Sequence, residues 1–270
     1  MEFREKVVVI TGASSGIGLA CARKFAELGA KVVIASRSEN ILSEIAKEIE
    51  SGGNTCLAVK TDVSLETDCE KLCETAIKKF GRIDILINNA GISMRALLKD
   101  VDITVLKQVM DVNFWGTVYC TKFFLPHIQK TKGTIVGISS IAGFHGLPGR
   151  TAYSASKSAM QGFLESVRIE NLKNGVQVLI LAAGFTSTNI RKRALDAHGK
   201  PQGETPLNEN KLIPPGRVAK NVIRAIKKGK RNRIMTVEGQ LMVFLQRIIP
   251  KLVDSVIYNK FKREKNSLLS

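Results

Sequence analysis

Short runs of almost continuous apolar residues recur along the first two thirds of the chain. Six of them occupy residues 6–10, 31–35, 55–60, 84–88, 133–138 and 176–181. A run of this length that is apolar at nearly every position is typical of a strand covered on both faces. The pattern therefore predicts strands buried in the middle layer of the protein.

Longer stretches of helical character lie between these runs. They cover residues 17–28, 39–51, 64–80, 104–130 and 152–173, and several are followed by a glycine (Gly29, Gly52, Gly81, Gly175), a common helix end. Strands that alternate with helices form right-handed βαβ units around a parallel sheet. We therefore predict an α/β fold with a doubly wound parallel sheet.

The periodic pattern loosens after residue 185, with no linker of Pro, Gly and Ser and no internal repeat. A chain of 270 residues with 44% hydrophobic content can bury a substantial core, so we predict a single domain. We expect a core at 1–195, then a substrate flap and last strand at 196–235, with the polar stretch 196–216 as the flap. A basic, amphipathic C-terminal helical extension covers 236–270.

The first predicted strand runs directly into the turn "TGASSGIG", from Thr11 to Gly18, and then into a helix. Gly12, Gly16 and Gly18 permit a tight turn, close approach of the backbone to a pyrophosphate, and close packing of helix on strand. This position predicts a dinucleotide site of the Rossmann type.

The same letters also spell G-x-S-x-G, the turn that carries the nucleophile of serine hydrolases, here with Ser14. That alternative leaves Gly18 without a role. It also needs a partner among the three histidines, His127, His145 and His198, and no local feature selects one.

Tyr153 and Lys157 are four residues apart in a predicted helix, and residues at this spacing share a face. A nearby cation stabilises a phenolate and lowers the pKa of the tyrosine, as a proton donor working near neutral pH requires. The alternative is a surface tyrosine beside a solvated lysine.

Six short motifs in fixed order favour the dinucleotide site and the catalytic tyrosine over their alternatives. They are "TGASSGIG", "DV" at 62–63, "NNAG" at 88–91, "DVN" at 111–113, "GISS" at 137–140 and "YSASK" at 153–157. Over residues 5 to 190 the chain resembles the short-chain dehydrogenases/reductases. The resemblance implies four catalytic residues, Asn113, Ser140, Tyr153 and Lys157.

In the roles that the resemblance implies, Tyr153 donates a proton to a carbonyl under reduction and Ser140 holds the carbonyl oxygen. Lys157 lowers the pKa of the tyrosine and binds the nicotinamide ribose. Asn113 sits at a kink in its helix and holds a water that links the lysine to solvent, while Ser139 is structural.

The resemblance also implies a cofactor site, with Asp62 at the adenine ring, Val63 beside it and Asn89 touching the cofactor. Where the family commonly has Pro-Gly, this chain has Ala183-Gly184, so we expect a softer loop there. The predicted cofactor residues are Gly12, Ser14, Ser15, Gly16, Ile17, Gly18, Arg37, Asp62, Val63, Asn89, Ala90, Gly91, Tyr153, Lys157, Gly184, Thr186 and Thr188.

The end of the second strand predicts which nicotinamide cofactor is used. An NAD site usually has a carboxylate about 20 residues after the glycine turn, whereas this chain has Ser36 followed by Arg37. A guanidinium can bind a 2′-phosphate, so we predict NADP(H) and, because cells usually keep it reduced, ketone reduction. The alternative is an arginine that is merely solvated.

These features favour an NADPH-dependent enzyme that interconverts a ketone and a secondary alcohol, on a hydrophobic or lipid-like substrate. Two alternatives stay open: a 3-oxoacyl thioester reductase acting on an acidic acyl carrier, and a nucleotide-binding scaffold without turnover. Nucleic-acid binding is not predicted, because the excess of charge comes without an aromatic platform, finger or basic helix motif.

The net charge of +17 is concentrated at the C-terminal end. Residues 211–270 contain fifteen Lys and Arg against three Asp and Glu. Within them, Leu241–Tyr258 is apolar but too interrupted to span a bilayer. We expect this segment either to lie on an anionic membrane surface or to cover the substrate pocket or a dimer partner.

The remaining predictions concern location and assembly. The start of the chain lacks the pattern of a signal peptide, and the odd number of cysteines, five, lacks metal-ligand spacing. We therefore expect a cytoplasmic enzyme, with the membrane surface as a second location, reduced core thiols and no metal. A homodimer is expected through the apolar faces of 104–130 and 152–173.

Overall fold

The computed structural model describes residues 3–205, 212–264 and 266–269 and contains one seven-stranded parallel sheet. The strands lie in the order β3-β2-β1-β4-β5-β6-β7. Their bounds are β1 (Val7–Thr11), β2 (Lys31–Ser36), β3 (Cys56–Lys60), β4 (Ile85–Asn88), β5 (Thr134–Ser140), β6 (Gln177–Ala183) and β7 (Asn232–Ile234). The doubly wound parallel sheet predicted from the sequence is confirmed.

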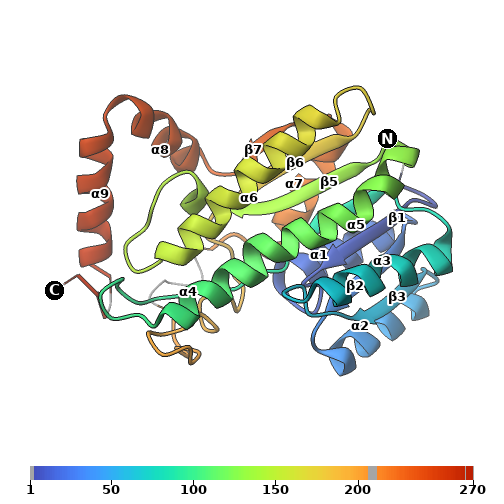
Figure 1. Ribbon diagram of the computed structural model, residues 1–270, viewed down its shortest axis with the longest axis horizontal. Helices are drawn as coiled ribbons and strands as arrows, with labels where there is room; N and C mark the ends of the chain where they lie inside the picture. Colours follow the sequence, from blue (N-terminus) through green and yellow to red (C-terminus); the bar gives the residue numbers. More distant parts are fainter. Residues whose placement is uncertain (1–2, 206–211, 265, 270) are drawn as a thin grey trace.

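Helices cover both faces of this sheet (Figure 1). On one face lie α1 (Gly16–Glu27), α2 (Glu39–Ser51) and α7 (Pro215–Lys227). On the other lie α3 (Glu66–Phe80), α5 (Gly116–Thr131) and α6 (Thr151–Glu170). The remaining elements are α4 (Ile103–Met110), the π-helical turn η1 (Asp111–Trp115), the 3-10 turn η2 (Ile141–Gly143), α8 (Val237–Ile248) and α9 (Pro250–Lys262).

The apolar runs form buried strands because successive side chains of a strand point to opposite faces. In β1, Val8 and Ile10 pack with α1, α2 and α7, whereas Val7 and Val9 pack with α3, α5 and α6. Each large apolar side chain that is removed from water in this way contributes about 1.5–3 kcal/mol. Both layers of helices therefore depend on the same strands.

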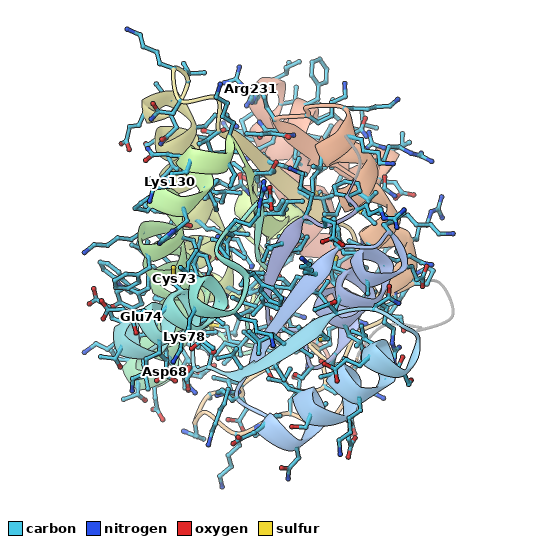
Figure 2. The ribbon with its side chains drawn as sticks, turned by 90° about the vertical axis from the view of Figure 1, so that its right-hand side faces the viewer. Asp68, Cys73, Glu74, Lys78, Lys130 and Arg231 are labelled. Carbon is cyan, nitrogen blue, oxygen red and sulfur yellow. The ribbon has the colours of Figure 1, made fainter. Side chains whose placement is uncertain are left out.

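The outer surfaces of these helices are polar. In Figure 2, Glu74 and Lys78 of α3 lie on the surface of the molecule. On the inner side of the same helix, Cys73 is buried with Cys69. All five cysteines are free and buried, as predicted, and burial raises the pKa of the Cys73 thiol to about 12, so the thiolate is disfavoured.

The predicted helix 104–130 is interrupted. Its central turn is the π-helix η1 between α4 and α5, a wider turn with an additional residue. The periodicity of apolar residues hardly changes across one such turn, which explains why the sequence pattern indicated one continuous helix. The kink expected at Asn113 is present, because this residue is the centre of η1.

The apolar segment Leu241–Tyr258 is divided between two helices. The division falls at Ile249, whose backbone (φ −131°, ψ 59°) is not helical, as expected for the residue before Pro250. Figure 1 shows α8 and α9 at one end of the longest axis of the molecule, at the opposite end from α2 and β3. Among the described residues, no helix is long and apolar enough to cross a membrane.

The fold does not test two predictions, the substrate flap and the homodimer. Part of the expected flap, residues 206–211, lies outside the described residues. The helix faces expected to form a dimer carry exposed apolar side chains, Trp115 on η1 and Ile169 on α6, which are 44% and 61% exposed. The dimer stays a prediction.

Candidate active site

The candidate site lies at the carboxyl ends of the strands, where the strand order reverses between β1 and β4. Loops that follow neighbouring strands at such a point leave toward opposite faces of the sheet and open a crevice between them. The glycine turn follows β1, "NNAG" begins in β4, and Ser140 is the last residue of β5. The predicted site residues from distant parts of the chain are thus brought to one edge of the sheet.

The glycine turn is packed tightly against the loop after β4. Gly12 has a positive φ of 65°, and a Cβ added there would lie 2.8 Å from the Cα of Ala90. A Cβ on Gly18 would clash with the carbonyl oxygen of Gly12 and lie 2.5 Å from Nδ2 of Asn89. Only glycine fits at these two positions.

Asn89 stabilises the contact between the glycine turn and the loop after β4. Its Nδ2 donates to the carbonyl oxygens of Thr11, at 2.9 Å, and Gly12, at 3.1 Å. In return, the Thr11 hydroxyl accepts from the backbone N–H groups of Asn89 and Ala90, each at 3.1 Å. The side chain of Asn89 therefore holds the turn in shape, and Thr11 is a member of the site that the sequence analysis did not assign.

The first turn of α1 is suited to bind an anion. The first N–H groups of a helix have no partner within it, and Ser15, the N-cap residue, makes no side-chain hydrogen bond to them. These groups belong to Gly16, Ile17 and Gly18, and Thr188 approaches them, with its Cγ2 only 3.0 Å from where a Cβ of Gly16 would be. This arrangement fits the pyrophosphate of a dinucleotide.

Asn113 is fully buried at the centre of η1 and joins three segments. Its Oδ1 accepts from the N–H of Ile92 at 2.8 Å, and its Nδ2 donates to the carbonyl of Ile92 at 3.0 Å and to Ser156 Oγ at 2.9 Å. Gly91 leaves the space for this amide, because a Cβ there would lie 3.1 Å from Oδ1. Asn113 thereby connects the loop after β4 to the catalytic helix α6.

Ser140, Tyr153 and Lys157 meet as predicted. Tyr153 lies in the first turn of α6, where the Ser140 side chain is near enough to oppose the rise of its pKa, and the Oγ of Ser140 accepts from the N–H of Ala142 at 3.2 Å. The Lys157 Nζ lies 6.0 Å from the centroid of the Tyr153 ring. Ser139 faces away and accepts from Gln161 at 2.7 Å, which agrees with a structural role.

The prediction that Lys157 lowers the pKa of Tyr153 was wrong. Burial raises the pKa of Tyr153, and the groups that oppose this rise are Ser140, Arg150 and Arg191. The ammonium of Lys157 is placed over the ring and donates to the carbonyl oxygen of Ile138 at 2.9 Å. Burial also lowers the pKa of Lys157 to about 8.

Lys157 has donors to spare for a ligand. An ammonium has three, and one is used by Ile138. Within residues 3–205, 212–264 and 266–269, no carboxylate lies within ion-pair distance of it, although its side chain is only 4% exposed. A buried cation with free donors next to Gly91, in the loop after β4, fits the ribose hydroxyls of a nicotinamide nucleotide. The nicotinamide of such a nucleotide would supply a hydride.

This burial has a consequence for stability. The unfolded chain keeps the lysine proton up to its ordinary pKa of 10.5, whereas the folded protein releases it near 8, so Lys157 opposes folding at neutral pH and less so as the pH rises. Between about pH 7 and pH 9, we expect the free energy of unfolding of the unmodified protein to rise about 1 kcal/mol more than that of Lys157→Met. Urea titrations at the two pH values measure this difference, and parallel pH dependence would contradict it.

Arg150, which the sequence analysis missed, lies just before α6. Its side chain is 8% exposed and its Nη1 donates to the carbonyl oxygen of Met94 at 2.8 Å. It is one of the cations that act on the pKa of Tyr153. In the sequence, Arg150 follows Gly149 and resembles a solvated arginine of a loop. Only its burial in the structure shows that it belongs to the site.

The other predicted cofactor residues are partly engaged within the protein. Asp62 Oδ1 accepts from the Ser64 hydroxyl at 2.7 Å, and Val63 is buried beside Gly116. The Thr186 hydroxyl donates to the carbonyl of Gly184 at 2.9 Å, so it does not point freely toward a nicotinamide. Arg37 is exposed at the end of β2.

The serine hydrolase alternative requires a histidine beside Ser14, and the described residues provide none. His145 lies 3.8 Å from Asp254, and His198 lies 3.2 Å from Asp102. His127 is on α5, and in the part of the chain that the structure describes no histidine hydrogen-bonds to Ser14. A nucleophile without its base would be unreactive.

Comparisons with known proteins agree with this geometry. The family model "short chain dehydrogenase" matches residues 6–198. The chain is 34% identical to mouse Dehydrogenase/reductase SDR family member 7B over 98% of this chain and 84% of that protein. It is 35% identical to 11-beta-hydroxysteroid dehydrogenase A of Sesamum indicum, over 84% of this chain and 67% of that protein.

Two solved structures are similar. A short chain dehydrogenase/reductase from Burkholderia phymatum in complex with NAD has a TM-score of 0.84 and 26% identity, covering 93% of this chain and 96% of that one. An alcohol dehydrogenase from the archaeon Thermococcus sibiricus complexed with 5-hydroxy-NADP has a TM-score of 0.74 and 27% identity, covering 85% and 94%. Structures of this fold thus hold either type of nicotinamide cofactor.

Proposed function

The chain belongs to the short-chain dehydrogenase family and is an oxidoreductase, and from this premise we propose that it reduces hydrophobic ketones to secondary alcohols with NADPH. The observation that carries the proposal is the meeting of Ser140, Tyr153 and Lys157, with Lys157 next to Gly91 of the loop after β4. A hydroxyl, a phenol and an ammonium in this order can bind a carbonyl oxygen and deliver a proton to it.

In this mechanism the Ser140 hydroxyl donates to the substrate carbonyl oxygen, and Tyr153 gives that oxygen its proton. Burial raises the pKa of Tyr153, so the phenol is protonated and ready to donate at neutral pH. Lys157 orients the ribose and places a positive charge near the phenolate that forms. Asn113 keeps η1 and α6 together, so that Lys157 stays in reach of the loop after β4.

NADPH is proposed because the end of β2 carries no carboxylate. The position after the strand is the exposed Arg37, and Ser36 Oγ is engaged by the N–H of Ser38 at 3.2 Å. A carboxylate here would repel a 2′-phosphate, whereas a guanidinium attracts one and can bind it through charge-assisted hydrogen bonds.

A hydrophobic substrate is proposed because apolar groups surround the loop between Ser140 and Tyr153. Leu147 in this loop packs against Val253, Ile257 and Phe261 of α9. The relative named as a hydroxysteroid dehydrogenase supports the same class of substrate. A 3-oxoacyl thioester would offer a comparable apolar chain and remains the second candidate.

We expect NADPH consumption to depend on added ketone and kcat/KM to rise with the chain length of the ketone. Arg37→Ala should lower the ratio of kcat/KM with NADPH to that with NADH by about tenfold or more, because a charge-assisted contact is lost. Arg231→Ala, an exposed arginine before β7, is the matched control and should leave the ratio unchanged.

Other outcomes would contradict parts of the proposal. Reduction of carrier-bound 3-oxoacyl thioesters alone would select the second candidate. An unchanged cofactor ratio in Arg37→Ala would remove the argument for NADPH. Cofactor binding without consumption across the ketones and thioesters would indicate a scaffold.

A further inference from the structure

The hairpin formed by α8 and α9 has an apolar inner face that belongs to the folded domain. Val253, Ile257 and Phe261 are buried, with Met242 and Leu245 of α8 packed against them. Two other contacts hold the end of the chain: the Arg95 Nη2 donates to the carbonyl of Asn266 at 2.6 Å, and Leu268 packs against Gly149. The hairpin is therefore anchored next to the catalytic loop.

The outer face of the same hairpin is also apolar. Among the described residues, seventeen large hydrophobic side chains are exposed, and eight of them lie between Val237 and Tyr258. The other nine are distributed over the much longer remainder of the chain. An apolar surface concentrated in this way marks a contact with a membrane or another protein.

Spacing aligns these side chains along the helices. On α8, Val237, Leu241, Phe244 and Ile248 follow at intervals of four, three and four residues, which places them on one face. Leu252 and Val256 do the same on α9. Phe244 and Ile248 are each 60% exposed and Leu252 is 57% exposed, although the opposite face of each helix is packed.

The charged residues of this C-terminal segment also differ between its inner and outer sides. Two acidic groups of the C-terminal segment are near basic groups of the domain: Asp254 of α9 lies 3.8 Å from His145, and Glu264, just after α9, lines a cleft with Arg95 and Arg150. The exposed Glu238 lies at the start of α8, away from the junction of the two helices. The exposed cations Arg247 and Lys251 border the junction of the two apolar rows, and Lys262 and Arg263 end α9. Near the junction of α8 and α9, the outer face is thus apolar with a basic border.

We infer that this outer face docks on the surface of an anionic membrane. Phe244, Ile248 and Leu252 would enter the boundary between headgroups and acyl chains, and Arg247 and Lys251 would meet lipid phosphates. A second copy of the chain fits less well, because pairing through this face would bring the same cations together. The contact does not depend on the proposed reaction.

The test is co-sedimentation of the full chain with vesicles of phosphatidylcholine that contain roughly a quarter of phosphatidylserine. We expect the protein to pellet with them at low salt, to be released at high salt, and to remain in solution with phosphatidylcholine alone. The double variant Phe244→Glu, Leu252→Glu should lower the partition coefficient at least about tenfold.

Leu172→Glu is the matched control, because Leu172 is 68% exposed outside the hairpin, and this variant should pellet like the unmodified protein. Far-UV circular dichroism and a cooperative urea transition show that each variant is folded. Failure of the unmodified protein to pellet, or equal partition of the double variant, would overturn the inference. A fall in molar mass of the double variant by light scattering, without loss of vesicle binding, would instead identify the face as an interface between copies.

Discussion

Tyr153→Phe is expected to lower kcat/KM for ketone reduction by about 10²–10⁴-fold, the usual contribution of a positioned proton donor. The change removes one oxygen atom. The ring of Tyr153 and the ammonium of Lys157, which approaches it at 6.0 Å, stay in place. Binding of NADPH should therefore change little, and the loss should fall on kcat.

Initial rates of ketone-dependent NADPH oxidation measure this effect, with the dissociation constant of NADPH determined separately. Tyr119→Phe is the matched control, because Tyr119 stacks on Trp115 and its hydroxyl has no hydrogen bond within the described residues. It should retain full activity. A Tyr153→Phe variant with undiminished turnover would show that another group donates the proton.

Gly18→Ala is expected to abolish high-affinity binding of NADPH. The added methyl group would overlap the carbonyl oxygen of Gly12 and lie 2.5 Å from Nδ2 of Asn89, so the backbone of the turn must move. Overpacking of this kind costs about 1–3 kcal/mol of stability. Because the displaced turn is the one that would hold the pyrophosphate, we expect affinity to fall at least about tenfold.

Gly162→Ala provides the control within α6. A Cβ at Gly162 meets nothing within 4 Å, and glycine inside a helix is destabilising relative to alanine by about 0.5–1 kcal/mol. The control should therefore unfold at a higher urea concentration, whereas Gly18→Ala unfolds at a lower one. Equal NADPH affinity in the two variants would contradict the role given to Gly18.

The sequence predicted the strands well for a physical reason. Strands covered on both faces need apolar side chains at successive positions, and β1 and β2 carry such runs. The seventh strand, Asn232–Ile234, is short and largely exposed, so it leaves no apolar run. The glycine turn was predictable because backbone crowding at Gly12 and Gly18 excludes every other residue.

Long-range features were not predictable in the same way. The π-turn at Asn113, the buried Arg150 and the direction of the pKa change of Tyr153 all depend on what surrounds a residue in the folded protein. The spacing of Tyr153 and Lys157 correctly brought the two together. The spacing could not show that burial has a larger effect on the pKa of Tyr153 than nearby positive charge has. The extent of burial depends on segments that are distant in the sequence.

The bond between Arg95 and Asn266 joins residues 171 positions apart, and this separation bears on how the protein matures during synthesis. Domains fold from the N-terminus as the chain emerges, and β1 to β6 are complete by Ala183. The glycine turn and the catalytic residues are therefore made long before the hairpin and the residues that hold it against the catalytic loop. A nascent chain can therefore assemble β1 to β6 and the catalytic residues first, and the hairpin is held against the catalytic loop only after Asn266 has left the ribosome.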